Sequence, residues 1–140
     1  MEIISNSVLK TQKLAEDLAQ NLGNYNVVCL YGELGAGKTT FVSGFSRGLG
    51  IRRRILSPTF VVVREYKIPK KGGILFHIDL YRLNNNREIE DLGISELLCD
   101  PKNIVIVEWA EKLGPLLPKE RIEVKFKVED VYRKIQICRN

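Results

Sequence analysis

The sequence has few of the features that disulfide-linked, zinc-binding or membrane-embedded proteins need. Only three of its 140 residues are cysteines, and Cys29, Cys99 and Cys138 lie far apart. This spacing suits neither a disulfide framework nor a zinc site, and idle thiols indicate a reducing compartment. No apolar stretch approaches the roughly 20 residues of a membrane span, and residues 1–6 do not resemble a secretion signal. We therefore expect a cytoplasmic protein without membrane association.

Length and composition favour one globular domain. Hydrophobic residues make up 44% and charged residues 28% of the chain, and 140 residues suffice to bury one sheet beneath helices. We expect a single domain over residues 1–140. The net charge of +5 suits polyanionic partners such as nucleotides or RNA, although proteins that bind no nucleic acid carry similar charge.

A glycine-rich motif is the most informative feature of the sequence. Residues 32–39 read Gly-Glu-Leu-Gly-Ala-Gly-Lys-Thr and match the Walker A pattern G-x-x-x-x-G-K-[ST], directly after the apolar run 27–31. Glycines let successive backbone N–H groups converge on one anion, and the following helix adds the positive end of its dipole. Lysine then supplies a charge for the β- and γ-phosphates, and the threonine hydroxyl is placed to ligate Mg²⁺. The motif predicts nucleoside triphosphate binding through Gly35, Ala36, Gly37, Lys38, Thr39 and Thr40.

Hydrophobic periodicity predicts the order of helices and strands. Helical patterns occupy residues 7–23, with Ser7 as the N-cap, and the stretch after the glycine-rich motif as far as Gly50. A third helical pattern covers residues 87–99 and breaks near Gly93. Strand patterns occupy residues 27–31, 60–66, 74–79, 104–107, 122–128 and 131–137. Together they predict an α/β, P-loop NTPase-like domain with a central, mostly parallel sheet, flanking helices, and antiparallel hairpins at the edges.

Two acidic residues end predicted strands and are candidates for catalysis. Asp79 follows the run 74–78 and Glu108 follows the run 104–107. In parallel nucleotide-binding sheets the ligand lies beyond the carboxyl ends of the strands, so either acid can face the glycine-rich motif and serve Mg²⁺ or the attacking water. The plainer alternatives are that Glu108 caps a surface strand and that Asp79 only starts a turn.

Three further positions have both a functional and a structural interpretation. Trp109, the only tryptophan, lies either beside the nucleotide or packed in the core. Thr59, in the segment Ser-Pro-Thr-Phe at 57–60, closes on phosphate or Mg²⁺, or else Pro58 merely shapes the start of a strand. For His77, the only histidine, a satisfied strand position is favoured over a catalytic base because nothing identifies a partner.

Basic residues outside the glycine-rich motif also allow two interpretations. In the predicted strand 131–137, Arg133 points to the same face as the apolar Val131 and Ile135. An unpaired charge is costly on such a face. Arg133 either reaches the nucleotide or bends to solvent at a sheet edge. The cluster 52–54 reads Arg-Arg-Arg, and Lys70 and Lys71 follow further on. These residues approach RNA or form a solvated surface, and the lack of interleaved aromatic residues favours the second alternative.

Taken together, four motifs resemble a known family in their order and spacing. They are residues 32–40, Ser-Pro-Thr-Phe at 57–60, His-Ile-Asp-Leu-Tyr-Arg at 77–82, and Glu-Trp at 108–109. In these motifs the chain closely resembles the TsaE family, formerly YjeE, the small bacterial ATPases of tRNA threonylcarbamoyladenosine biosynthesis. The resemblance spans residues 7–128, and none of the four motifs departs from the family pattern.

The resemblance implies an ATPase that acts with TsaD and TsaB. It would bind their heterodimer, so that ATP binding and hydrolysis permit repeated N6-threonylcarbamoylation of adenosine 37 in tRNAs that read ANN codons. TsaD would perform the modification itself, and tRNA would contact this chain indirectly or weakly. Lys38 would then bind the phosphates and Asp79 would support catalysis or switching. Thr39 and Glu108 would serve Mg²⁺, and Thr59 would belong to a switch-like segment.

By the same resemblance Trp109 would lie beside the nucleotide, while Thr11 and Arg133 would line its pocket. Competing functions are a small P-loop kinase or GTPase and a nucleotide-gated binding module with negligible turnover. The sequence contains no Asn-Lys-x-Asp guanine reader, which favours ATP over GTP, and residues 87–99 are too short and acidic for an arginine-bearing kinase lid. We expect slow hydrolysis by the isolated chain and acceleration by partners, because so small a domain has little surface to exclude water.

Overall fold

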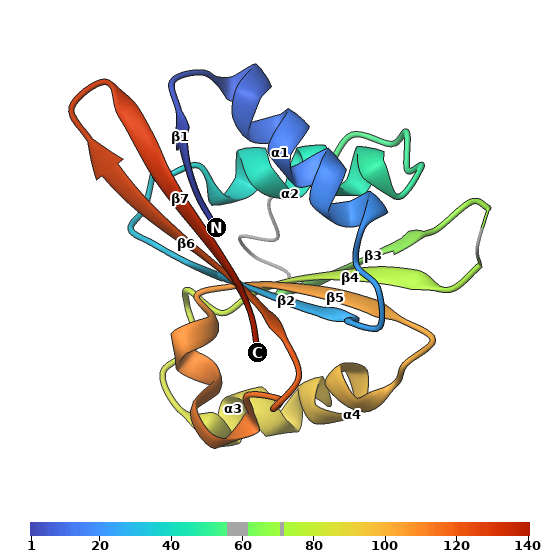
Figure 1. Ribbon diagram of the computed structural model, residues 1–140. Coiled ribbons are helices and arrows are strands. Elements are labelled where there is room, and N and C mark those ends of the chain that lie inside the picture. Colours follow the sequence, from blue (N-terminus) through green and yellow to red (C-terminus); the bar gives the residue numbers. More distant parts are fainter. Residues whose placement is uncertain (56–61, 71) are drawn as a thin grey trace.

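The computed structural model describes residues 1–55, 62–70 and 72–140. A single mixed sheet runs through its centre, with the strand order β1-β7-β6-β2-β5-β4-β3 (Figure 1). The strands are β1 (Glu2–Ser5), β2 (Val27–Tyr31), β3 (Val63–Lys67), β4 (Ile74–Asp79), β5 (Ile104–Glu108), β6 (Ile122–Glu129) and β7 (Tyr132–Arg139).

The centre of the sheet is parallel and its edges are antiparallel. Strand β2 pairs in parallel with both β5 and β6, and β4 pairs in parallel with β5. At the edges β3 is antiparallel to β4, and β7 is antiparallel to both β6 and β1. The predicted α/β architecture is therefore confirmed. Because the carboxyl ends of β2, β4 and β5 meet at one edge, their last residues and the loop after β2 share a single location.

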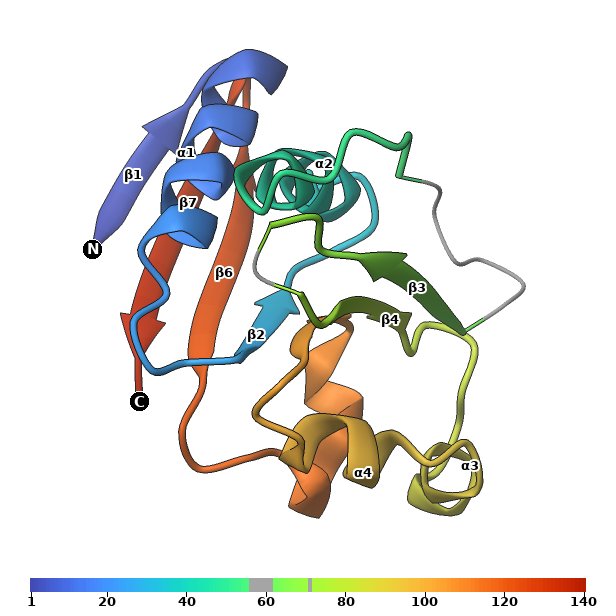
Figure 2. The same cartoon turned by 90° about the vertical axis from the view of Figure 1, so that its right-hand side faces the viewer.

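Helices cover both faces of the sheet. Helices α1 (Val8–Gln20) and α2 (Lys38–Gly48) lie on one face, and α3 (Asn86–Asp91), α4 (Ile94–Cys99) and the 3₁₀ helix η1 (Ala110–Leu116) lie on the other (Figures 1 and 2). The predicted N-cap is confirmed, because the Ser7 side chain accepts from the Lys10 backbone N–H at 3.1 Å. The predicted break near Gly93 is confirmed as well, since it separates α3 from α4.

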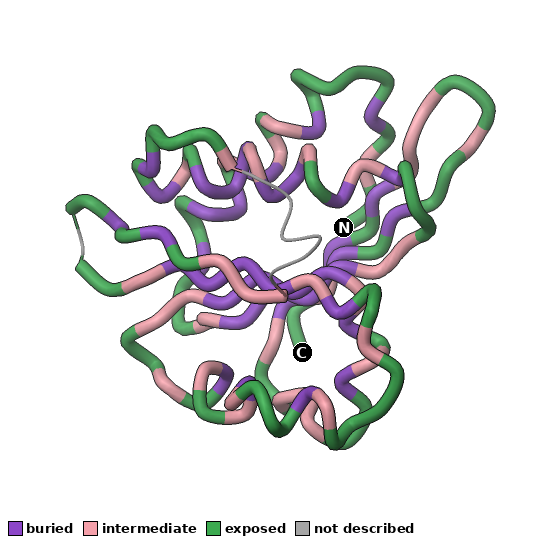
Figure 3. The backbone as a smooth tube through the Cα atoms, turned by 180° about the vertical axis from the view of Figure 1, so that it is seen from behind, coloured by how far each residue is buried: buried purple, intermediate pink, exposed green. Residues whose placement is uncertain are grey.

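The sheet is buried from both sides, so there are two apolar cores. Along β2, Val28 and Leu30 belong to the core under α1 and α2, whereas Val27 and Cys29 belong to the core under α3, α4 and η1. Figure 3 shows the buried strands crossing the middle of the molecule and the exposed residues at its loops. A strand covered on both faces needs apolar residues in both phases, which explains the uninterrupted run in β2.

Helices α1 and α2 approach each other very closely. A side-chain carbon at Gly44 would lie 2.3 Å from the Gln12 carbonyl oxygen, and one at Gly48 would lie 2.5 Å from that of Glu16. Only glycine leaves room for this backbone contact. The packing therefore fixes α2, and with it the loop at its amino end, against the rest of the fold.

Several boundaries differ from the sequence predictions. The strand predicted at residues 60–66 runs over Val63–Lys67 within the described residues. The strand predicted from Val131 begins at Tyr132, because Val131 is 86% exposed in the turn. Strand β1 and helix η1 were not predicted, since neither segment has a strong period. Residues 57–60, which include Thr59, and Lys71 lie outside the described residues.

Candidate functional site

The glycine-rich motif forms the connection between β2 and α2. Gly35 and Gly37 have φ angles of 78° and 104°, and Gly37 is the N-cap of α2. Residues with side chains rarely adopt such angles. Within the described part of the chain, the N–H groups of Gly35, Gly37, Lys38 and Thr39 donate to no backbone carbonyl. These donors at a helix amino end form a site suited to an anion.

A hollow of about 310 Å³ opens beside this loop. It lies between the loop and the carboxyl ends of β4 and β5, as the parallel sheet predicts. Both candidate acids line it, together with one face of the glycine-rich motif. Its lining residues are Leu34, Gly35, Gly37, Lys38, Thr39, Thr40, Asp79, Tyr81, Glu108 and Trp109.

Glu108 is a buried acid of the site rather than a cap on a surface strand. It is the last residue of β5 and is 3% exposed. One carboxylate oxygen, Oε1, accepts from the Thr39 hydroxyl at 3.5 Å, and the other, Oε2, lies 2.5 Å from Nε2 of His77. A carboxylate this buried needs such partners to keep its charge. The structure thus ties Glu108 both to the phosphate loop and to β4.

His77 is buried in β4, but its partner was missed by the sequence analysis. Its side chain is wholly buried, and among the described residues its Nδ1 has no hydrogen-bond partner. The parallel register places His77 opposite Ile106 and Asp79 opposite Glu108. The Glu108 side chain reaches back along the sheet to the imidazole. The sequence does contain a hint of this contact, because His77 lies two residues before Asp79 and another predicted strand ends in Glu108. The hint identifies the partner only once the register of β4 and β5 is known.

Asp79 both starts a turn and faces the site. Its Oδ1 accepts from the Tyr81 backbone N–H at 3.0 Å, and its side chain lines the hollow. Burial raises the pKa of Asp79 above its ordinary value, and the nearby Glu108 carboxylate adds to this shift. The Tyr81 hydrogen bond and the charges of His77 and Lys38 oppose it. The two interpretations left open by the sequence are therefore compatible.

Lys38 is held inside the site. Its Nζ donates to the Gly32 carbonyl oxygen and lies 3.8 Å from the centre of the Trp109 ring. The residue is only 4% exposed. Burial lowers the pKa of Lys38, and the carboxylates of Glu108, Glu111 and Asp79 oppose that shift. The ammonium is thus poorly solvated, which strengthens its attraction for an anion entering the hollow.

Trp109 is turned toward the site by an unusual backbone conformation. Its φ of 58° is the only positive φ outside glycine among the described residues, and such conformations cluster at functional sites. The centre of the indole lies 5.1 Å from that of the Tyr81 ring, and the two rings are tilted by 42°. The Lys112 Nζ donates to the Tyr81 and Leu83 carbonyl oxygens at 2.5 and 2.9 Å. Trp109 lines the first hollow and also packs against the apolar core on this face of the sheet, and its position beside a nucleotide stays a prediction. Tyr81 lies in the motif at 77–82 but was given no role, and Lys112 was missed because it lies in no motif.

A second hollow, of about 290 Å³, lies on the other side of the same loop. Thr11 and Arg133 line it with Gly35, Gly37 and Thr40. The Arg133 guanidinium donates to the Gly35 carbonyl oxygen at 3.4 Å, so the side chain bends to the loop. Thr11 is buried, and its hydroxyl lies 2.6 Å from that of Ser5. Ser5 in turn pairs with Arg133 across β1 and β7. These contacts bring two weakly predicted residues to the phosphate loop.

The oxygen atoms at the first hollow fit Mg²⁺ better than a softer metal. Thr39 contributes a hydroxyl and Glu108 a carboxylate, while Asp79 lines the same space. Across residues 1–55, 62–70 and 72–140, no group of three or more His, Cys, Asp and Glu side chains could hold a metal alone. Mg²⁺ is usually held by one or two carboxylates together with substrate phosphates. The donor set therefore suits a cation that arrives with a nucleotide.

The loop, the sheet and the converging acids define a P-loop NTPase fold. A comparison of structures agrees: the crystal structure of YdiB from Bacillus subtilis matches with a TM-score of 0.81 at 31% sequence identity, over 98% of this chain and 83% of that one.

Sequence comparisons then identify the family. The model of the family described as "Threonylcarbamoyl adenosine biosynthesis protein TsaE" matches residues 5–135. The chain therefore belongs to the TsaE family. A protein of Aquifex aeolicus named tRNA threonylcarbamoyladenosine biosynthesis protein TsaE is 40% identical over 99% of this chain and 96% of its own length. The protein of that name from Bacillus subtilis is 43% identical over 73% of this chain, and the match spans 61% of that relative.

No described helix is both long and apolar enough to cross a membrane.

Proposed function

We propose that this chain is the ATP-binding and ATP-hydrolysing subunit that works with TsaD and TsaB in N6-threonylcarbamoylation of adenosine 37 in ANN-reading tRNAs. The family membership and the names of the relatives support the pathway. One observation supports the proposed ATPase activity: the phosphate loop, Lys38 and two carboxylates line a single hollow. A tRNA substrate is consistent with a cytoplasmic protein.

The proposal gives each side chain a distinct task. The loop N–H groups and Lys38 bind the phosphates and hold the terminal phosphoryl group in place. Thr39 and Glu108 hold Mg²⁺, which when bound neutralises charge on the phosphate oxygens. His77 fixes the direction of the Glu108 carboxylate from behind. Asp79, with its raised pKa, is placed to orient the attacking water. Thr59 remains a candidate for the switch segment.

The second hollow suits the nucleoside part of the ligand. Thr11 and Arg133 lie across the loop from the acids, so an extended nucleotide would lie along the loop between the two spaces. Trp109, fixed against Lys38, closes the phosphate end.

Exposed apolar side chains at the rim support the involvement of partner proteins. Leu34 is 66% exposed and Tyr81 is 43% exposed, and both line the first hollow, beside Lys38 and Glu108. Covering such residues favours association, and a partner over this rim would exclude water from the phosphates. We therefore expect slow hydrolysis by the chain alone and faster hydrolysis in the complex.

The test is ATP hydrolysis measured with and without TsaB, TsaD and tRNA. Lys38→Ala serves as the blank, and Lys119→Ala, an exposed lysine outside the hollow, is the matched control. We expect stimulation by the partners, loss of activity in Lys38→Ala and no change in Lys119→Ala. Full-speed turnover by the chain alone, or ready phosphorylation of a nucleoside, would contradict the proposal.

A related experiment separates hydrolysis from nucleotide binding. Glu108→Gln keeps the shape of the side chain but removes its charge, so it should bind ATP and hydrolyse it poorly. If this variant supported repeated tRNA modification in the reconstituted system, the chain would instead act as a nucleotide-gated binding module.

A further inference from the structure

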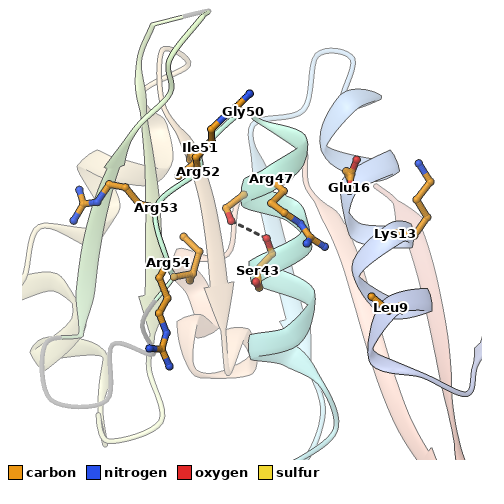
Figure 4. Close-up of a pocket in the computed structure, with 12 residues that line it drawn as sticks. Leu9, Lys13, Glu16, Ser43, Arg47, Gly50, Ile51, Arg52, Arg53 and Arg54 are labelled. Atoms are coloured by element: carbon orange, nitrogen blue, oxygen red, sulfur yellow. Dashed lines mark hydrogen bonds between the residues drawn. The ribbon is translucent and has the colours of Figure 1, made fainter.

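Basic residues unused by the nucleotide site gather at the carboxyl end of α2. Two adjoining hollows of about 900 and 790 Å³ share residues 50–53, and we call them together the basic groove. The first lies between α1, α2 and residues 50–55, and the second extends to the β3–β4 hairpin. Figure 4 shows Lys13 on α1, Arg47 on α2, and Arg53 and Arg54 on the segment that follows.

The basic groove contains the whole charge excess of the protein. Seven basic and two acidic side chains line it, so its net charge is +5, equal to that of the entire chain. The remaining residues are therefore balanced in charge. A local excess of this kind marks a binding surface for a polyanion, whereas a diffuse excess would indicate only solubility.

Within the described part of the chain, the three consecutive arginines have no anionic side-chain partner. Arg52, Arg53 and Arg54 are exposed, and no carboxylate of the described residues forms an ion pair with them. Arg53 lies over the Tyr66 ring at 5.4 Å, and Arg47 donates to Gln12 at 3.0 Å. Figure 4 shows the Arg53 and Arg54 side chains pointing away from each other, so their charges are spread over the surface, which suits phosphates spaced along a nucleic acid backbone.

We propose that the basic groove binds the phosphate backbone of a base-paired RNA stem. Guanidinium groups match phosphate oxygens through paired hydrogen bonds. Three of the seven basic side chains of the groove are lysines, and lysine, unlike arginine, is depleted in protein–protein interfaces. The described lining includes no aromatic side chain on which an unpaired base could stack. This absence, which in the sequence favoured a solvated surface, argues only against a single strand, because a base-paired stem is bound through its backbone. The identity of the RNA as tRNA rests on the function proposed above.

The groove and the nucleotide site are separate. Helix α2 has 11 residues and is therefore about 16 Å long, with the phosphate loop at its amino end and the groove at its carboxyl end. No described residue lines both the groove and either of the two hollows beside the glycine-rich motif. RNA and nucleotide can thus bind together, and changes in the groove should leave ATP binding intact.

The test is fluorescence anisotropy of a labelled, unmodified tRNA transcript with the full chain, between 50 and 200 mM salt. We expect Arg52→Gln with Arg54→Gln to weaken binding at least about tenfold at the lower salt concentration. The slope of log affinity against log salt should fall by about two, since two phosphate contacts are lost. Arg52→Lys with Arg54→Lys should keep most of the slope because the charges remain.

The matched control is Lys119→Gln with Lys125→Gln, which removes the same charge from exposed positions outside the groove. It should bind tRNA within about twofold of the unchanged chain. Three results would overturn the proposal. The first is an equal loss of tRNA affinity in the glutamine variants of the arginines and of the control lysines. The others are unchanged affinity in Arg52→Gln with Arg54→Gln, and loss of the salt dependence in Arg52→Lys with Arg54→Lys. Tighter binding of a single strand of equal length would also overturn the proposal.

Two other measurements separate this proposal from neighbouring ones. If the arginine variant bound tRNA normally but lost its association with TsaB and TsaD, the groove would be a protein interface and the RNA proposal would fail. ATP binding by calorimetry in the same samples checks the fold and the nucleotide site. Loss of tRNA binding with ATP binding retained supports the groove, whereas an unchanged chain that binds tRNA but no ATP would defeat only the ATPase proposal.

Discussion

The buried contact between His77 and Glu108 permits a quantitative test of how the site is held. The two side chains are 0% and 4% exposed and their polar atoms lie 2.5 Å apart. Replacing His77 with leucine removes the donor to Oε2 and leaves a buried carboxylate with only the long Thr39 contact. Breaking a buried pair in this way costs about 3–5 kcal/mol. For a chain of this size, that loss lowers the melting temperature by about 10–17 °C.

A double-mutant cycle isolates the interaction itself. His77→Leu, Glu108→Leu and the double variant would be unfolded in urea at pH 7 and followed by far-UV circular dichroism. Because replacing both members with apolar residues leaves no unpaired charge, the double variant should be more stable than the sum of the single losses predicts. We expect a coupling free energy of about 2–3 kcal/mol.

The exposed pair Lys13 and Asp17 provides the control. Its polar atoms lie 3.2 Å apart on the surface of α1, with side chains 68% and 54% exposed. The same cycle there should give a coupling below about 0.5 kcal/mol. If the His77–Glu108 coupling were equally small, the imidazole would not hold the carboxylate, and the positioning role given to His77 would be wrong.

Three other predictions concern stability and reactivity. Burial raises the pKa of Asp79 above 3.8, so the folded chain loses stability as pH rises through that raised pKa. Urea titrations should show Asp79→Asn more stable than the parent at pH 7, by under about 1 kcal/mol given solvent screening, with no gain at pH 3. Gly44→Ala should cost about 3 kcal/mol in the same assay because α1 must move away, whereas Ser43→Ala should cost little. Burial also raises the pKa of Cys29 to about 12, so thiol titration at pH 8 should modify exposed Cys99 quickly and Cys29 only after unfolding.

Much of the scaffold was predictable because its signals are local. The phosphate loop has a fixed spacing of glycine, lysine and threonine, and the buried strands are uninterrupted apolar runs bounded by breakers. The parallel order then requires Asp79 and Glu108 to end at the same edge. These inferences need only the periodicity of hydrophobic residues and the right-handedness of the connections between parallel strands.

The features that were missed depend on tertiary contacts. The imidazole of His77 meets Glu108 only because β4 and β5 are in one particular register. The left-handed conformation of Trp109 is imposed by its neighbours, since a tryptophan has no intrinsic preference for it. Strand β1 has only four residues and acquires its order from β7, so no short window of sequence reveals it.

Strand β1 also has a practical consequence for work with this protein. The Met1 amino group donates a hydrogen bond to the Ile137 carbonyl oxygen. The Ser5 hydroxyl lies 2.6 Å from that of Thr11, and Ser5 is the partner of Arg133 in the pairing of β1 with β7. Strand β1 therefore supports the wall of the second hollow, which Thr11 and Arg133 line, although it lies far from the glycine-rich motif in the sequence. Because β1 covers the edge of β7 and Ser5 contacts the buried Thr11, we expect changes in β1 to weaken the binding of a ligand in that hollow.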